Sequence, residues 1–408
     1  MLANPLLRRA SPYLFLAVLP ALVHLPGLAG GVRVAAWSQS ATPDPALALR
    51  LALMAISGLA AYALIRRLQT GVWAALTAAS LFALNGTFAW FSGGPALPIA
   101  ALPLLLLGVE QARARALPWA LVLGTGGLLL SLRETAIPPY AALTLVWAAC
   151  RLGTTPRPWL LALGGTALGL LPALPVLAAL WHPILPAPPP GIRGLATASS
   201  FLPADATLML FPYVFGDPTA PAAVTGREAA IWAHGGGYLD LTWTLLAMSA
   251  LRGGAGLPLL RRALGVFLLV SLVCAAGLAP MFANPADVLV CWCITAATLA
   301  GLTLDDWRRG ITPRFRRAML FLSPVLPCVI APPYFNILLA MRERRPGIVF
   351  PGVITGLSIS IVVQLAVVIF LSALLRHSPT RVRVFAVSAL LAGNTLGLFL
   401  TPMFDGVK

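Results

Sequence analysis

Residues 49–91 decide the fold of this chain: "LRLALMAISGLAAYALIRRLQTGVWAALTAASLFALNGTFAWF". Two apolar runs stand on either side of the short polar link "RRLQTG" at 66–71. Each run is long enough to cross a hydrocarbon core of ~30 Å as an α-helix. Similar apolar runs recur along all 408 residues. We therefore expect an all-α fold, a polytopic bundle of transmembrane helices.

The composition agrees with a membrane protein. Hydrophobic residues make up 59% of the chain and charged residues only 10%, with a mean hydropathy of +0.89. A soluble domain carries about 25% charged residues. We expect one integral membrane domain, 1–408, with about thirteen spanning helices. The predicted segments are 12–30, 47–65, 72–91, 96–110, 117–132, 135–150, 158–181, 238–251, 263–282, 287–304, 318–338, 348–375 and 384–402.

Two pairs of predicted segments are joined by very short links. We expect tight helical hairpins of 72–91 with 96–110 and of 117–132 with 135–150. The glycines of "LGTGGLLL", Gly124, Gly126 and Gly127, fall inside an apolar segment and are typical of close helix packing. They lack the strand and the acidic partner of a dinucleotide site.

The net charge of +16 sets the orientation. Basic residues occur as pairs between apolar runs, and most fall in alternate links, as the positive-inside rule requires of cytoplasmic loops. We therefore expect a multi-pass protein of the bacterial inner membrane, with the N-terminus cytoplasmic and the C-terminus extracytoplasmic. The cluster "RERR" at 342–345 is the main exception. No basic stripe is interleaved with aromatic residues, so no nucleic-acid partner is expected.

The longest connector, 182–237, is expected on the extracytoplasmic side. It opens with "PAPPPG" at 186–191, which favours an extended conformation. The apolar segment 199–218 is expected to be re-entrant or interfacial. Polar side chains gather between residues 217 and 240. They are suited either to binding the hydroxyl groups of a sugar or to ordinary solvation of a loop. They are Asp217, Arg227, Glu228, His234, Tyr238 and Asp240.

A second charged site lies in "SLRETAIPPY", between two predicted segments. Arg133 and Glu134 are held there close to membrane depth, where charges are expensive unless they face a cavity or a partner. Mutual pairing of the two side chains is the alternative. Three further acids, Glu110, Asp305 and Asp306, lie near arginines of their own helices. For these we expect local ion pairs at the inner membrane surface.

Motifs of soluble enzymes are missing from the chain. There is no GxxxxGK[ST], no GxSxG and no HExxH. The five cysteines form no CxxC pair and are typical of small buried apolar residues. We expect no metal site and no cofactor.

Several patterns resemble those of the YfhO-type bacterial membrane proteins, which belong with the multi-helix GT-C glycosyltransferases. The resemblance covers about residues 45–310. It includes the 49–91 stretch quoted above and the following "LPLLLLGVEQARAR". It also includes "SLRETAIPPYAAL", which is similar to a G-x-P-E-T turn, "LLPALPVLAAL", and "FPYVFGDP…GGGYLDLTWTLLAMSAL".

The resemblance implies an enzyme that transfers a sugar from a polyprenyl-phosphate carrier on the extracytoplasmic side. The family's first outer loop corresponds to residues 31–46, whose only acid is Asp44. Asp44 and Glu134 are the implied catalytic residues. The family's loop and G-G-Y elements match Asp217, Gly236, Gly237 and Tyr238, with Asp240 in place of a glycine. Arg133, Arg193 and Arg227 are available for the carrier phosphate.

Two other functions stay open at the level of sequence. The short first outer loop and the few outer carboxylates suit a non-catalytic subunit or assembly scaffold of a larger membrane complex. Its partners would be membrane lipids and other membrane subunits. A transporter or flippase is the third alternative. Such proteins usually contain inverted repeats and broken helices, and no repeat is evident in this sequence.

Overall fold

The computed structural model describes residues 5–28, 45–85, 97–114, 119–131, 136–171, 241–252, 256–275, 285–311 and 362. Every regular element in these ranges is a helix, so the all-α prediction is confirmed for this part of the chain. The α-helices are α1 (Pro5–Leu28), α2 (Pro45–Arg67), α3 (Val72–Ala83), α5 (Leu97–Arg113), α6 (Trp119–Ser131), α7 (Ile137–Arg151), α8 (Pro156–Leu170), α13 (Leu241–Ser249), α14 (Pro258–Ala275) and α15 (Pro285–Arg308). A 3₁₀ turn, η6 (Ala250–Arg252), follows α13.

The predicted segments locate these helices well. Each predicted segment up to residue 304 overlaps one helix, whereas 318–338, 348–375 and 384–402 lie outside the described residues. Proline supplies several of the helix starts, among them Pro45 of α2, Pro156 of α8 and Pro258 of α14. Its fixed φ suits the first helical position, where the missing N–H would have had no partner within the helix.

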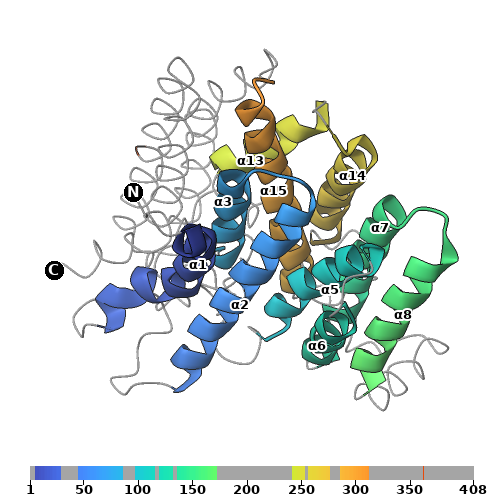
Figure 1. Cartoon of the computed structure of the whole chain (residues 1–408), viewed down its shortest axis with the longest axis horizontal. Coiled ribbons are helices and arrows are strands. Elements are labelled where there is room, and N and C mark those ends of the chain that lie inside the picture. Colours follow the sequence, from blue (N-terminus) through green and yellow to red (C-terminus); the bar gives the residue numbers. More distant parts are fainter. Residues whose placement is uncertain are drawn as a thin grey trace, which may run out of the picture.

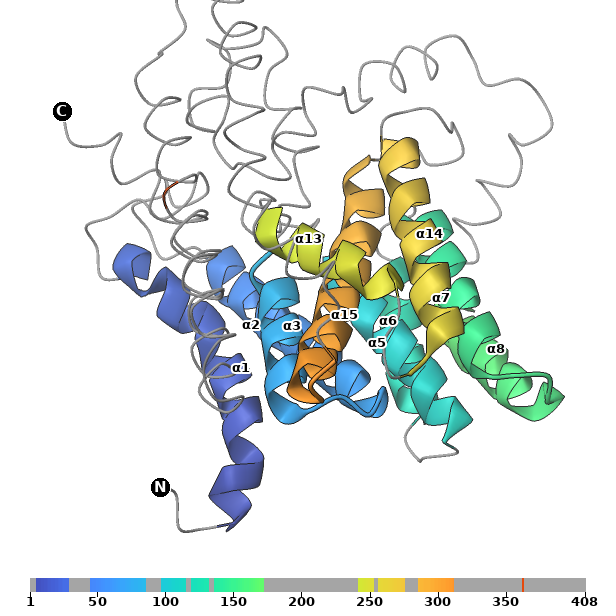
Figure 2. The ribbon, with the colours of Figure 1, turned by 90° about the horizontal axis from the view of Figure 1, so that it is seen from above.

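Helix α15 lies at the centre of the described bundle. It packs against α13, α14, α3 and α7 and also contacts α5 and α2 (Figures 1 and 2). Within the described residues it is the one helix long and apolar enough to cross a membrane, over Asp287–Arg308. Of its most apolar 18 residues 94% are buried, and a core helix of a soluble protein can have the same length, composition and burial.

The predicted hairpins are wrong for the described residues. Helix α6 packs along α5 and α8 rather than α7, and α3 packs along α2 and α15 rather than α5. Glycine residues explain why α6 packs against α8. A Cβ on Gly127 would lie 2.9 Å from the Cα of Gly169 in α8, so only glycine permits this approach of α6 to α8. The prediction that these glycines serve helix packing is thereby confirmed for Gly127.

Apolar side chains also point away from the bundle. On α14 the exposed residues Leu259, Val266, Leu269, Val270 and Val273 recur at helical spacing and form one stripe. An equivalent stripe is formed by Leu160, Leu163 and Leu168 of α8 and by Leu171, which directly follows the helix. Leu160 is 69% exposed and Val266 is 62% exposed. A surface helix of a soluble protein has the opposite pattern, with polar residues on its outer face.

Candidate functional site

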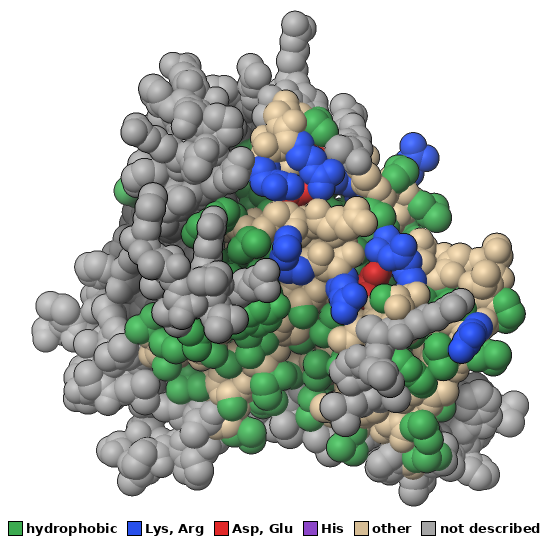
Figure 3. All heavy atoms as spheres, viewed as in Figure 1, with side chains coloured by type: hydrophobic (Ala, Val, Ile, Leu, Met, Phe, Trp, Pro, Cys, Tyr) green, Lys and Arg blue, Asp and Glu red, His purple; other side chains and the backbone are tan. Residues whose placement is uncertain are grey.

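Arginines of distant helices gather at one end of the bundle. The residues belong to the ends of α2, α5, α7 and α15 and to the start of α14, and we call this region the basic end. Figure 3 shows arginine side chains grouped around acidic ones on this face. In Figure 2 the α2–α3 turn and the end of α15 lie along the same edge of the bundle as the start of α1. The charges are held by three buried carboxylates.

Glu110, in the last turn of α5, is the first of these carboxylates. Its Oε1 accepts hydrogen bonds from Arg151 Nε and from Trp147 Nε1, the latter at 3.0 Å. Its Oε2 accepts from Arg151 Nη2 at 2.9 Å and lies 3.5 Å from Arg113 Nη1. The carboxylate side chain is 1% exposed and that of Arg151 is 7% exposed. The pair ties the end of α5 to the end of α7.

Asp305, in the last turn of α15, is the second. Its Oδ1 accepts from the backbone N–H of Gly71 and from Arg308 Nε, both at 2.8 Å, and its Oδ2 lies 2.7 Å from Arg309 Nη2. Arg309 Nη2 also donates to the carbonyl oxygen of Gln69 at 3.1 Å. Gln69 has φ 63°, a left-handed conformation that turns the chain from α2 into α3. Asp305 therefore fixes the α2–α3 turn against α15.

Asp306 is the third. Its two oxygens accept from Arg261 Nη1 at 2.8 Å and Arg261 Nη2 at 3.1 Å, a bidentate ion pair between α15 and α14. Both side chains are buried, at 3% and 5% exposed. Arg261 Nε donates to the carbonyl oxygen of Gly256 at 2.9 Å, so each of the three guanidinium nitrogens donates a hydrogen bond.

The prediction of local ion pairs is thus correct in part. Glu110 lies near Arg113, and Asp305 pairs with Arg308 and Arg309, as their spacing suggested. The buried partners are different. Arg151 belongs to another helix than Glu110, and Arg261 to another helix than Asp306, so the spacing of residues within one helix gives no signal for them.

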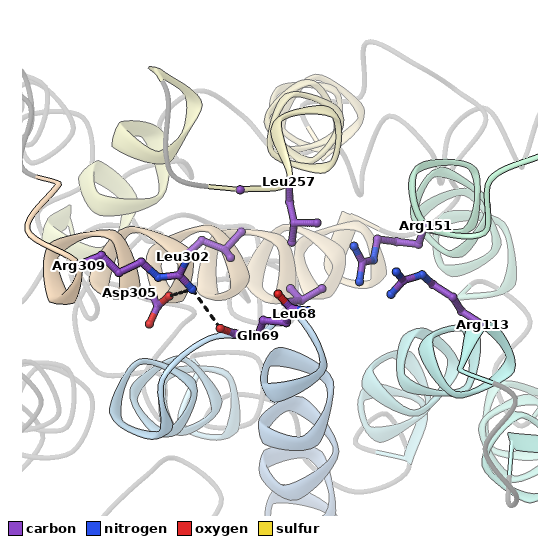
Figure 4. A pocket seen from close by; sticks show the side chains of 9 residues that line it. Leu68, Gln69, Arg113, Arg151, Leu257, Leu302, Asp305 and Arg309 are labelled. Carbon is purple, nitrogen blue, oxygen red and sulfur yellow. Dashed lines mark hydrogen bonds and ion pairs between the residues drawn. The ribbon is translucent and has the colours of Figure 1, made fainter.

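A pocket of about 250 Å³ opens between these clusters. Arg113 and Arg151 line one side of it and Arg309 and Asp305 the other, with Leu68, Leu257 and Leu302 between them (Figure 4). Gln69 and Gly256 complete the lining. The pocket combines cations at its sides with leucine between them, an arrangement suited to an anion that carries an apolar group. In the described part of the chain, no group of three or more His, Cys, Asp or Glu could hold a metal ion.

The residues predicted from sequence to form a catalytic site all lie outside the described residues. They are Asp44, Arg133, Glu134, Arg193, Asp217, Arg227, Glu228, His234, Tyr238 and Asp240. The helices that follow two of them are described. Asp44 directly precedes α2, and Glu134 comes shortly before α7. Because both helices end at the basic end, their first residues lie at the opposite end of the bundle.

Comparison with models of known protein families, with curated proteins and with solved structures gave no match for this chain.

Proposed function

We propose that this chain is a multi-pass protein of the bacterial inner membrane, with its basic end in the cytoplasm. The outward apolar stripes on α8 and α14 support this, because soluble proteins rarely expose contiguous apolar surface of this kind. Lipid would cover these stripes. The remaining predicted segments, including those beyond residue 311, would complete a bundle of about thirteen helices.

The gathering of arginines at one end supports the orientation. Helices that alternate in direction bring every second link to the same side, and cytoplasmic links retain arginine. The ends of α2, α5, α7 and α15 would then be cytoplasmic, as would the N-terminus before α1. The starts of α2 and α7 would face the extracytoplasmic side, and so would the C-terminus.

A cysteine-labelling experiment tests this orientation. Gln69→Cys, exposed in the α2–α3 turn, and Ser40→Cys, in the predicted first outer loop, are made in a chain whose native cysteines are replaced. In spheroplasts, a membrane-impermeant maleimide should label position 40 and should reach position 69 only after the membrane is opened. Labelling of position 69 in intact spheroplasts would refute the orientation.

We propose that the activity is transfer of a sugar from a polyprenyl-phosphate donor at the extracytoplasmic surface. One observation carries this proposal. The two implied catalytic acids, Asp44 and Glu134, precede helices that start at the same end of the bundle, away from the basic end. In the proposed orientation Asp44 and Glu134, which lie outside the described residues, would both be on the side where the resemblance places the reaction.

The chemistry follows from the residue types. Asp44 or Glu134 would accept the proton of an acceptor hydroxyl, which attacks the anomeric carbon of the sugar. The bond from that carbon to the carrier phosphate breaks, and the phosphate leaves with the electron pair. Arg133, Arg193 and Arg227 would stabilise the negative charge on the departing phosphate. Glu228, His234, Tyr238 and Asp240 would contact the sugar.

Substitution of the two acids tests the activity. Asp44→Asn and Glu134→Gln keep the side-chain size and remove the base. We expect each to abolish transfer of radiolabelled sugar from membrane lipid in reconstituted vesicles, while the protein remains in the membrane fraction. Asp205→Asn, in the same predicted extracytoplasmic region, is the matched control and should retain transfer. Full activity of both acid variants would refute the proposal.

A non-catalytic membrane subunit is the second candidate, and one observation favours it. The three described carboxylates at the basic end are all engaged by arginine, as in a rigid structural framework. Purification in mild detergent distinguishes the two. Fixed stoichiometry with other membrane proteins would favour the subunit, and a monomer with bound polyprenyl lipid would favour the enzyme.

A further inference from the structure

The strongest feature outside the proposed catalytic region is the pocket at the basic end. It lies between the ends of α5, α7 and α15, the start of α14 and the α2–α3 turn. No residue of the proposed transferase chemistry belongs to it. Its charges, its size and its lining each bear on what it could bind.

The charges around the pocket are unbalanced. Glu110 faces two guanidinium groups, those of Arg113 and Arg151, so one positive charge is in excess on that side. On the other side Asp305 faces both Arg308 and Arg309, which leaves another positive charge in excess. Figure 4 shows Arg113 and Arg151 close together across from Arg309. An anion between the two clusters would compensate both.

The arginines also retain donors for such an anion. A guanidinium carries five N–H donors. Arg309 uses Nη2 for both of its contacts with Asp305 and Gln69, and Arg113 reaches Glu110 only through Nη1 at 3.5 Å. Among the described residues, no acceptor contacts the remaining donors of these two side chains. Arg113 is 48% exposed and Arg309 is 40% exposed, so an external ligand can reach them.

The size and the lining of the pocket limit the kinds of ligand that it can bind. A volume of about 250 Å³ is slightly below the range of about 300–1,000 Å³ that is usual for small-molecule sites, and it suits a single headgroup. Leu68, Leu257 and Leu302 supply apolar surface directly beside the cations. A free inorganic anion has no apolar group to contact these leucines, whereas the glycerol ester region of a phospholipid can pack against them. Anionic lipids are attracted to basic pockets between helices on the cytoplasmic side of a membrane.

We propose that this pocket binds the phosphate of an anionic phospholipid from the cytoplasmic leaflet. Arg113 and Arg309 donate hydrogen bonds to the phosphate oxygens from opposite sides, while Arg151, held by Glu110, contributes charge. The leucines contact the part of the lipid nearest the headgroup. This proposal rests on the membrane embedding and orientation proposed above, and it is independent of the transferase activity.

Lipid titration with the purified full-length protein tests the proposal. Native mass spectrometry in detergent counts bound dioctanoyl phosphatidylglycerol, with dioctanoyl phosphatidylcholine as the neutral lipid and inorganic phosphate as competitor. We expect selective binding of one phosphatidylglycerol. Arg113→Gln and Arg309→Gln should each raise its Kd about tenfold, the effect of losing one charge-assisted hydrogen bond. Both side chains are partly exposed, so the variants should fold.

Arg67→Gln is the matched control. Arg67 is an exposed arginine at the end of α2, outside the pocket lining, and its replacement removes the same charge. Its Kd should equal that of the unmodified protein. Equal weakening by all three substitutions would overturn the pocket, because it would indicate nonspecific attraction. Displacement of the lipid by equimolar inorganic phosphate would overturn the lipid as the ligand.

The outcome is separable from that of the proposed function. If the chain leaves the membrane in alkaline carbonate, the embedding itself is refuted. If it remains in the membrane and shows no preference for phosphatidylglycerol, only the lipid site fails.

Discussion

Replacement of Glu110 by glutamine tests whether buried ion pairs hold the basic end together. Glu110→Gln keeps the shape of the side chain and removes its charge. Arg151, whose side chain is 7% exposed, then retains a positive charge without its carboxylate. Leaving one member of a buried pair uncompensated costs about 3–5 kcal/mol. We expect the free energy of unfolding to fall by about this amount.

The control removes the exposed partner of the same carboxylate. Arg113 is 48% exposed and lies 3.5 Å from Glu110, so its contribution is screened by water. Arg113→Gln should cost about 0–1 kcal/mol, as exposed pairs do. Unfolding is followed by far-UV circular dichroism during titration with SDS in mixed micelles. The difference between the two substitutions measures the effect of burial at one carboxylate.

A double substitution sharpens the prediction. Arg151→Met alone leaves Glu110 buried with a weak partner, and it should also be strongly destabilising. The double variant Glu110→Gln/Arg151→Met removes both charges, so its loss of stability should be smaller than the sum of the two single losses by about 2 kcal/mol. Additive losses, or a loss under about 1 kcal/mol for Glu110→Gln, would refute the view that this pair is a buried, coupled unit.

Three further predictions use the same unfolding assay. Gly169→Ala should destabilise by about 1–3 kcal/mol, since its Cβ would lie 2.5 Å from the carbonyl oxygen of Gly124. Gly164→Ala, where the added Cβ meets nothing within 4 Å, should be neutral or stabilising, and equal effects would contradict the packing account. Gln69→Val should cost about 1–3 kcal/mol because Gln69 has φ 63°, whereas Gln69→Gly should not; a neutral valine would refute the requirement for a left-handed residue. Asp305→Ala should cost about 1–3 kcal/mol because the Gly71 N–H loses its acceptor, while Asp305→Asn, which keeps that acceptor, should cost less; the reverse order would make the arginines its main partners.

The positions of the helices could be predicted because each depends on local sequence. Apolar runs of sufficient length place the starts of α2, α8 and α14 two to five residues after the observed ones, at Pro45, Pro156 and Pro258. The packing of these helices could not be predicted in the same way. A short link constrains only the two ends that it joins, whereas α6 lies along α8 because Gly127 meets Gly169. This contact depends on two glycines far apart in the sequence.

The charged clusters also combine contacts that local sequence predicts with contacts that it does not predict. The contacts of Asp305 with Arg308 and Arg309 follow from helical spacing, and the sequence predicts them. The partners of Glu110 and Asp306 lie 41 and 45 residues away, and nothing in the spacing identifies them. The pocket was missed for this reason, since it exists only where five chain segments meet. The predicted catalytic acids stay predictions, because they lie outside the described residues.

The hydrogen bond from the Gly71 N–H to Asp305 spans 234 residues and has a consequence for biogenesis. A ribosome adds about 5–20 residues per second, so roughly 10–50 s separate synthesis of the two groups. In the proposed membrane orientation, the α2–α3 turn would reach the membrane during this interval, before the helix that completes it is synthesised. We expect nascent chains that end before α15 to be captured by insertion chaperones or membrane proteases. The last turn of α15 would then act as a checkpoint at which the first half of the protein becomes resistant to degradation.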